Sequence, residues 1–204
     1  MYAIIACGVF RPELERVSRE LDFPVQVHYL GSGLHVDFDL LEEALKRELE
    51  SCSDCQGIIV LYGECHPKIH EILAPYKAEL IDCQNCIDAF LTRDGVARMS
   101  KGGLYFYLSP GWVECWREIF SSLNWSQEEA RLQLGPFKGF IFLDTLDNAD
   151  EHEPELMQFL DYTLLPYDVV PVDLGHFKSL ILDAKCKLDR ANEEPHKGAN
   201  KLEV

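Results

Sequence analysis

Short apolar runs alternate with amphipathic helical patterns along most of the chain, and this alternation constrains the fold more than any other feature. The runs around 58–61 and 140–143 are apolar throughout, which is typical of strands covered on both faces. The segment 39–47 has leucines three to five residues apart and begins with an Asp that can cap a helix. Strand-then-helix order predicts a three-layer α/β sandwich with an open, mainly parallel, Rossmann-like sheet. The predicted strands are 2–6, 25–30, 57–62, 79–82, 104–108, 139–144 and 169–173.

The length of the chain fits one large domain. It has 204 residues, of which 47% are hydrophobic, so one packed core can form. The residues after Cys186 are polar and aperiodic. We therefore expect a single α/β domain over 1–186 and a mobile tail over 187–204.

The charge of the chain excludes several classes of partner. The formal net charge is −16, from 35 acidic and 19 basic residues, and it repels nucleic acid and anionic lipid. No apolar run reaches the roughly 20 residues of a membrane span. The first residues lack the basic segment of a signal peptide, so we expect a cytoplasmic protein.

Three of the eight cysteines, Cys7, Cys65 and Cys86, each follow a predicted strand. In a parallel sheet the segments after the strands gather at one edge, where such folds bind ligands. The sequence therefore predicts a three-cysteine metal site, with zinc as the first choice and one coordination position open. An iron–sulfur cluster with one free iron is the alternative, and simple packing of buried thiols is a third interpretation. Candidates for a fourth ligand are Cys83, His35 and His66.

Two CxxC pairs offer a competing zinc site. Cys52 and Cys55 precede a predicted strand, whereas Cys83 and Cys86 follow one. In a parallel sheet the two pairs then lie at opposite edges, too far apart to share an ion. A redox role for Cys83 and Cys86 has no support from a neighbouring basic residue.

Other residues at the predicted ligand edge suggest roles in chemistry. Neither a G-x-G-x-x-G motif nor a P-loop is present, which argues against a common nucleotide site, and Ser109 lacks a G-x-S-x-G elbow. We expect proton transfer by His66 and His35. The expected substrate-binding residues are Tyr62, Gly63, Ser109 and Trp112.

The chain resembles the domain of unknown function 1638 family over roughly residues 2 to 182. The resemblance rests on Tyr62-Gly63-Glu64-Cys65-His66-Pro67, Asn85-Cys86-Ile87 and Ser109-Pro110-Gly111-Trp112, together with the early Cys7-Gly8. It implies a role for the same three cysteines. Some members look associated with corrinoid-dependent methyl transfer and anaerobic one-carbon metabolism, which implies a small-molecule substrate and a corrinoid or methyltransferase protein as partner. The competing hypothesis is a non-catalytic accessory protein that carries metal or docks onto such a partner.

Overall fold

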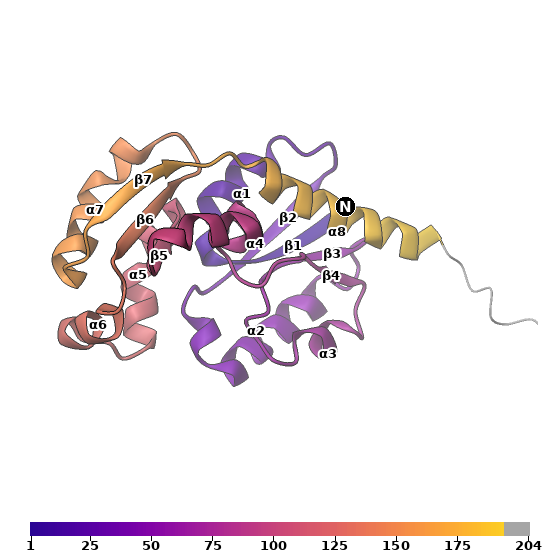
Figure 1. The fold of residues 1–204 in the computed structure, drawn as a ribbon. Helices are drawn as coiled ribbons and strands as arrows, with labels where there is room; N and C mark the ends of the chain where they lie inside the picture. The colour runs from indigo at the N-terminus through magenta and orange to yellow at the C-terminus, as the bar shows by residue number, and fades with distance from the viewer. Residues whose placement is uncertain (194–204) are drawn as a thin grey trace, which may run out of the picture.

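The computed structural model of the chain describes residues 1–193 and contains seven parallel strands. The predicted α/β class, Rossmann-like with parallel sheets, is confirmed. The strands divide between two sheets, where the sequence predicts one (Figure 1). Sheet A has the order β2-β1-β3-β4 and sheet B the order β5-β6-β7. The strands are β1 (Tyr2–Cys7), β2 (Val25–Leu30), β3 (Ile58–Leu61), β4 (Ala78–Leu80), β5 (Tyr105–Leu108), β6 (Gly139–Asp144) and β7 (Tyr167–Pro171).

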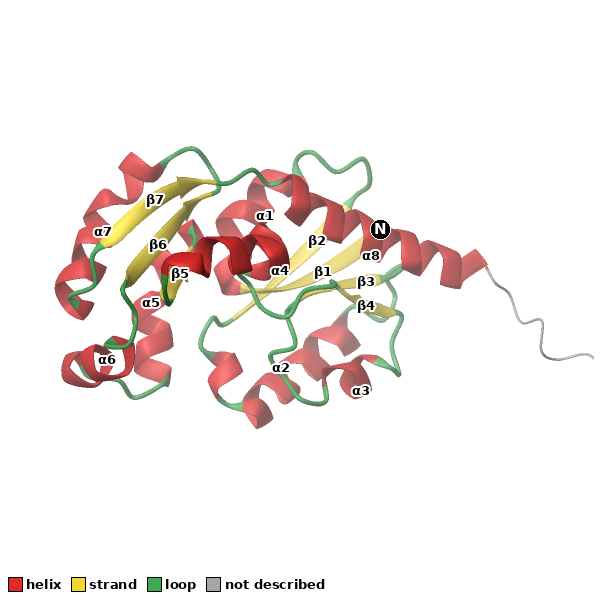
Figure 2. Ribbon diagram, viewed as in Figure 1, coloured by secondary structure: helices red, strands yellow, loops and turns green. Residues whose placement is uncertain are grey.

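Helices connect the strands and cover the sheets (Figure 2). Sheet A lies between α8 on one face and α2 and α3 on the other, while α5 packs on sheet B and contacts α7. Three short 3-10 helices are η1 (Gly8–Phe10), η2 (Leu34–Val36) and η3 (Ser100–Gly102). The α-helices are α1 (Arg11–Ser18), α2 (Phe38–Ser51), α3 (Ile69–Leu73), α4 (Asp88–Met99), α5 (Pro110–Ser122), α6 (Gln127–Leu134), α7 (Ala149–Thr163) and α8 (Gly175–Glu193).

The two central strands of sheet A, β1 and β3, have almost purely apolar sequences. Every residue of β1 and β3 is buried, because helices cover both faces of the sheet there. The register pairs Ile4 with Ile59 and Ile5 with Val60. The edge strand β2 is only half-buried and carries polar residues between the apolar ones. The core of this half of the molecule is therefore mainly aliphatic.

The second half of the molecule has an aromatic core. Phe159 of α7 packs against Trp116 and Phe120 of α5, and its ring centroid lies 4.9 Å from that of Phe140 on β6. The two halves meet where α5 contacts α1 and η1. We call this contact, with the residues after β1, β5 and β6, the seam.

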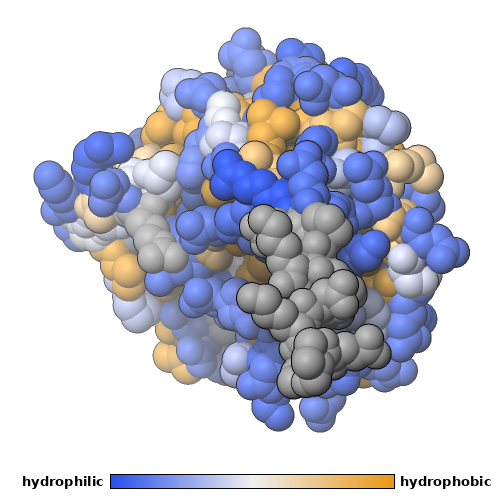
Figure 3. All heavy atoms as spheres, turned by 90° about the vertical axis from the view of Figure 1, so that its right-hand side faces the viewer, coloured by the Kyte–Doolittle hydropathy of each residue, from blue (hydrophilic) through white to orange (hydrophobic). Residues whose placement is uncertain are grey.

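The end of the described chain differs from the expectation. Helix α8 continues to Glu193, so residues 187–193 of the predicted mobile tail are helical. The remainder of that prediction, 194–204, lies outside the described residues. Figure 3 shows a surface around this end of the molecule on which hydrophilic side chains predominate, in line with the net charge of −16. Within 1–193, no helix is both long and apolar enough to cross a membrane.

Candidate functional site

The strand order of sheet A changes direction between β1 and β3. From β1 the chain first adds β2 on one side, and β3 then pairs on the other side. Open α/β sheets bind ligands outside the carboxyl ends of the strands at such a switch point. Cys7 is the last residue of β1, Cys65 lies in the loop after β3, and Cys86 lies between β4 and α4. The three predicted residues therefore come from one strand end and two loops, all at the ligand edge.

Close backbone contacts bring these loops together. A Cβ atom on Gly63 would lie 2.4 Å from the carbonyl oxygen of Gln84, and Glu64 donates its main-chain N–H to the same oxygen at 2.9 Å. A Cβ atom on Gly111 would lie 2.0 Å from the carbonyl oxygen of Val9. Only glycine permits these approaches. Gly63, predicted to bind substrate, thus packs the Cys65 loop onto the Cys86 loop.

The three thiols share one buried environment and influence one another. Burial raises the pKa of Cys7 and of Cys86 to about 12, and it raises the pKa of Cys65 as well. A charge on Cys86 or Cys65 raises the pKa of Cys7 further. Without a cation these side chains are neutral thiols at pH 7, because clustered thiolates repel one another and lose solvation.

Hydrogen bonds to the sulfurs act in the opposite direction. Trp112 donates its Nε1–H to the Sγ of Cys86 at 3.2 Å, and this bond lowers the pKa of Cys86. Main-chain groups lower the pKa of Cys7 and Cys65 in the same way. Donors of this kind stabilise the thiolate form. The three sulfurs are thus placed as hydrogen-bond acceptors.

Cys83 is placed differently from its neighbour Cys86. Its thiol donates to the main-chain oxygen of Tyr62, with 3.8 Å between sulfur and oxygen. Its pKa is raised to about 12 by burial and then by nearby acidic groups, Cys86 first. The environment of Cys83 favours a neutral, packed thiol.

The side chain of Tyr62 ends in an unpartnered polar group. Its hydroxyl is buried, has no well-formed hydrogen bond among the described residues, and lies next to the Cys7 sulfur, whose interaction with it raises its pKa. Burial raises its pKa, and charges on Cys7 and Cys65 would raise it further. An unpaired buried hydroxyl is costly. A thiolate at Cys7 would provide the missing acceptor.

Glu13 is a buried acid at the seam that the sequence analysis does not single out. It accepts a hydrogen bond from the Oγ1 of Thr145 at 3.0 Å, and bonds from Ser109 and the main chain of Gly111 lower its pKa. Burial outweighs them and raises the pKa to about 7. Its Oε2 has no hydrogen-bond partner in the described part of the chain, and its charge raises the pKa of Cys86. A carboxylic acid whose pKa is raised to about 7 therefore lies near the thiols.

A signal for Glu13 is present in the sequence. The residue lies between Phe10, Leu14 and Val17 on the buried face of α1. An acidic residue on an apolar helical stripe is either paired or functional.

The two predicted catalytic histidines have other partners. The Nδ1 of His66 accepts the main-chain N–H of Lys68 at 3.0 Å, and its Nε2 lies 3.7 Å from Glu42 of α2. His35 donates its Nδ1–H to the carbonyl of Ser32 at 2.9 Å, and burial lowers its pKa. Neither ring bonds to a cysteine within 1–193. Their proton-transfer roles stay predictions.

Ser109 and Trp112 lie at the start of α5. The Ser109 hydroxyl is fully buried and caps the helix by accepting the main-chain N–H of Trp112 at 3.4 Å. Trp112 also lines a pocket of about 260 Å³ beside Cys86, with Tyr105 and Tyr107 in its walls. The pocket is small, aromatic and next to the thiols.

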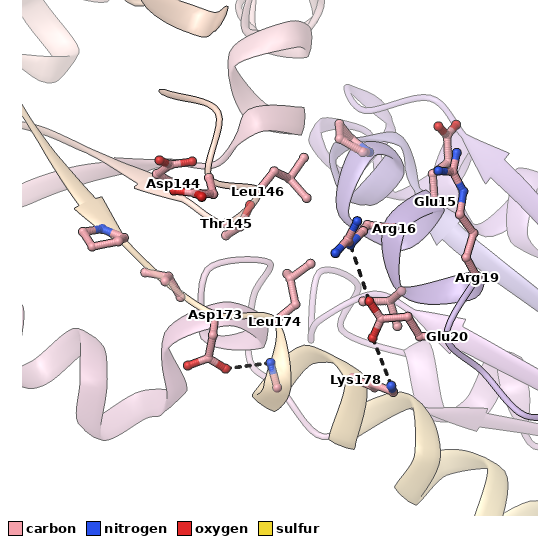
Figure 4. Close-up of a pocket in the computed structure, with 16 residues that line it drawn as sticks. Glu15, Arg16, Arg19, Glu20, Asp144, Thr145, Leu146, Asp173, Leu174 and Lys178 are labelled. Carbon is pink, nitrogen blue, oxygen red and sulfur yellow. Dashed lines mark hydrogen bonds and ion pairs between the residues drawn. The ribbon is translucent and has the colours of Figure 1, made fainter. Parts of the chain in front are cut away.

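A larger pocket of about 880 Å³ lies on the other side of the seam (Figure 4). It is bounded by α1, by the residues after β6 and β7, and by the start of α8. At one side of it Arg16 and Lys178 both pair with Glu20, at 3.4 and 3.1 Å. Thr145 belongs to its wall and contacts the buried Glu13, so this pocket also borders the seam.

No three His, Cys, Asp or Glu side chains within residues 1–193 lie close enough to form a ready metal-binding group. The thiols are neighbours in a shared environment without being arranged around a common point.

Parallel sheets with thiols at the ligand edge define the class, an α/β protein with a cysteine-lined switch point. Within this class the chain belongs to the family described as Protein of unknown function (DUF1638), which matches residues 29–181. The resemblance seen in the sequence is thereby confirmed. The match contains Cys65, Cys86 and the segment 109–112 and begins after Cys7. No curated protein and no solved structure matches the chain.

Proposed function

We propose that this chain is a metal-binding α/β protein in which Cys7, Cys65 and Cys86 hold one ion at the switch point, with zinc as the first choice. The observation that carries the proposal is the shared character of the three sulfurs. Each comes from a different segment at the ligand edge, all three are buried or half-buried, and each accepts a hydrogen bond that favours the thiolate. Simple packing requires no such donors, as Cys83 illustrates.

The donor set fits a divalent cation. A bound cation removes the mutual repulsion of the thiolates and reverses the rise in their pKa, since coordinated thiols are deprotonated. The Tyr62 hydroxyl, which has no well-formed hydrogen bond within residues 1–193, lies next to Cys7 and gains a stronger acceptor when Cys7 ionises. The Trp112 indole supplies the outer hydrogen bond that orients a ligand sulfur. Binding requires the three side chains to rotate toward a common point.

We further propose that the protein is an enzyme acting on a small molecule. A zinc ion with an open position lowers the pKa of a bound thiol or water. The pocket beside Cys86 supports this proposal because Trp112, Tyr105 and Tyr107 line it and give a small molecule an aromatic surface to bind. Glu13, whose pKa is raised to about 7 by burial, can hold or release a proton near the thiols. A cytoplasmic, reducing location suits thiols that are all free in the described chain. The family association suggests corrinoid-linked methyl transfer, with a corrinoid or methyltransferase protein as partner.

Metal analysis of anaerobically purified protein tests the proposal. We expect about one zinc per chain, lost in Cys7→Ser, Cys65→Ser and Cys86→Ser. Cys83→Ser is the matched control, because this thiol is also buried and in the same region, and it should retain the metal. Metal-free wild-type protein with all three thiols reduced would contradict the proposal.

The same preparation separates the alternatives. Iron with acid-labile sulfide on the same three cysteines would identify an iron–sulfur cluster. The variant Tyr107→Ala removes part of the pocket wall. If this variant keeps its metal and every candidate methyl-transfer activity is unchanged, the result would favour the accessory role.

A further inference from the structure

A second pair of cysteines, outside the candidate metal site, lies at the end of α2. Cys55 donates its main-chain N–H to the carbonyl of Cys52 at 2.9 Å, which closes a four-residue turn. Turns of this kind bring the first and fourth Cα atoms within about 7 Å, close to the range of about 4.4–6.8 Å that disulfides require. The Cys55 thiol also raises the pKa of Cys52, as expected of two neighbouring acidic groups. The backbone is therefore already shaped for a bond between these sulfurs.

The imidazole of His28 lies next to the Cys52 thiol, and the carboxylate of Glu48 lies next to that imidazole. The Nδ1 of His28 on β2 lies 3.0 Å from the Oε2 of Glu48, and its Nε2 lies 3.6 Å from the Sγ of Cys52. A carboxylate can only accept, so Nδ1 carries the hydrogen and Nε2 is free to accept the thiol proton. A nucleophile, a base and a group that orients the base thus lie in a row.

The two thiols differ in access. Cys52 is only 3% exposed, whereas Cys55 is half-buried and reaches the surface. A reagent from solution therefore meets Cys55 first, and Cys52 can only react within the chain.

We propose that Cys52 and Cys55 form a reversible thiol–disulfide site that reacts with low-molecular-weight disulfides, with His28 as the proton acceptor for Cys52. The Cys55 thiol loses its proton to solvent, and its thiolate attacks one sulfur of the small disulfide. The S–S bond breaks, and the small thiolate that leaves takes up a proton from solvent. The Cys52 sulfur then attacks the mixed disulfide while its proton passes to His28. The second small thiol leaves with that proton. Two cysteine thiols are oxidised and one small disulfide is reduced to two thiols.

This site is separate from the strand-end cysteines. Cys52 and Cys55 precede β3, whereas Cys65 follows it, so the length of the strand lies between them. Loss of one site therefore leaves the other testable. Oxidation here joins two ends of a turn that already exists, so the fold can accommodate both states.

Treatment of reduced full-length protein with 2-hydroxyethyl disulfide, followed by acid quenching and peptide mapping, tests the proposal. We expect wild-type protein to yield one intramolecular bond between Cys52 and Cys55, reversed by dithiothreitol. Cys52→Ser should stop at a mixed disulfide on Cys55, and Cys55→Ser should react far more slowly. Cys186→Ser removes another exposed thiol and should behave as wild type.

The role of His28 has its own readout. His28→Gln should accumulate the mixed disulfide on Cys55, with resolution slowed about 100-fold as for loss of a general base, while the first step keeps its rate. Circular dichroism checks that the variant is folded. The peptide map of the wild-type protein tests the thiol–disulfide site itself. A stable mixed disulfide on Cys55, a bond from Cys52 or Cys55 to another cysteine, or no reaction at either residue would overturn the proposal. Equal rates of resolution with and without His28 would overturn the assignment of the base.

Discussion

The two halves of the molecule use the same strand–helix unit and bury different side chains. Sheet A is packed mainly by isoleucine, leucine and valine and has one small cluster of Phe10, Phe90 and Phe177, whereas sheet B and its helices enclose a larger cluster of aromatic rings. Polar groups are concentrated at the seam, where Glu13 meets Thr145 and Trp112 meets Cys86. The thiols come from one half and the indole donor from the other. The candidate site therefore depends on how the halves meet, and variants of each region should separate the contributions.

Loss of the central ring of the aromatic half should have the largest effect. Phe159 contacts rings of α5 and β6, and Phe159→Ala should lower the free energy of unfolding by about 4 kcal/mol. Because the seam couples the halves, urea unfolding followed by circular dichroism and by thiol labelling should show one transition. Met157→Ala on the exposed side of the same helix is the control. Two separate transitions in the variant would show that the halves unfold independently.

A methyl group added at the seam should cause the second-largest loss of stability. Gly111→Ala places Cβ 2.0 Å from the carbonyl oxygen of Val9, so two backbones must separate, at a cost of about 3 kcal/mol. Urea denaturation measures the loss, and metal content should fall with it. In Gly102→Ala the nearest atom is 3.5 Å away, and stability should change by less than about 0.5 kcal/mol. Equal stability of the two variants would mean that the seam is loosely packed.

The buried acid should make stability depend on pH. Burial raises the pKa of Glu13 from its ordinary value of 4.5 to about 7, so the folded chain keeps a proton that the unfolded chain has lost. Stability should therefore fall as the pH rises from 4.5 through 7, by on the order of 3 kcal/mol. Glu13→Gln should remove this slope, and the exposed Glu153→Gln should retain it. The measurement is urea denaturation at a series of pH values; the prediction fails if wild type and Glu13→Gln have parallel profiles.

The smallest expected effect concerns one hydrogen bond across the seam. Trp112→Phe keeps a ring but removes the N–H donated to Cys86, which should cost about 1 kcal/mol of stability. Zinc affinity, measured by competition with a chromogenic chelator, should fall about tenfold. Trp125→Phe, a tryptophan of the aromatic half without a bond to sulfur, should keep the wild-type affinity. A loss of the same size in both variants would assign the effect to packing.

The local elements of the fold could be predicted from sequence, because apolar runs and turn residues identify each strand. All seven predicted strands exist. Two of them match the predicted range at both ends, and the ends of the others differ by no more than two residues. Helix α6 is harder to predict, because it is short and buries only Ala130 and Leu134. Its signal is a Ser126 cap that accepts the main-chain N–H of Glu129. The division into two sheets depends on long-range pairing, which no local pattern encodes.

The site was partly predictable for the same reason. Strand ends locate Cys7, Cys65 and Cys86 at one edge, since parallel strands fix which end each loop occupies. The directions of individual side chains depend on tertiary neighbours: His66 turns toward Glu42, and Trp112 serves as a donor to sulfur. Whether the three sulfurs ligate one ion stays a prediction.

Helix α8 has a consequence for the order in which the protein can assemble. It follows sheet B in sequence, yet it packs across β3 and β4 of sheet A. Leu188 of this helix reaches the position of Gly57, directly before β3. During synthesis on the ribosome, the face of sheet A that α8 covers therefore stays exposed until the second half of the chain has emerged. Folding of the first half is completed by nearly the last part of the described chain to be made, which leaves the nascent protein exposed to aggregation for most of its translation.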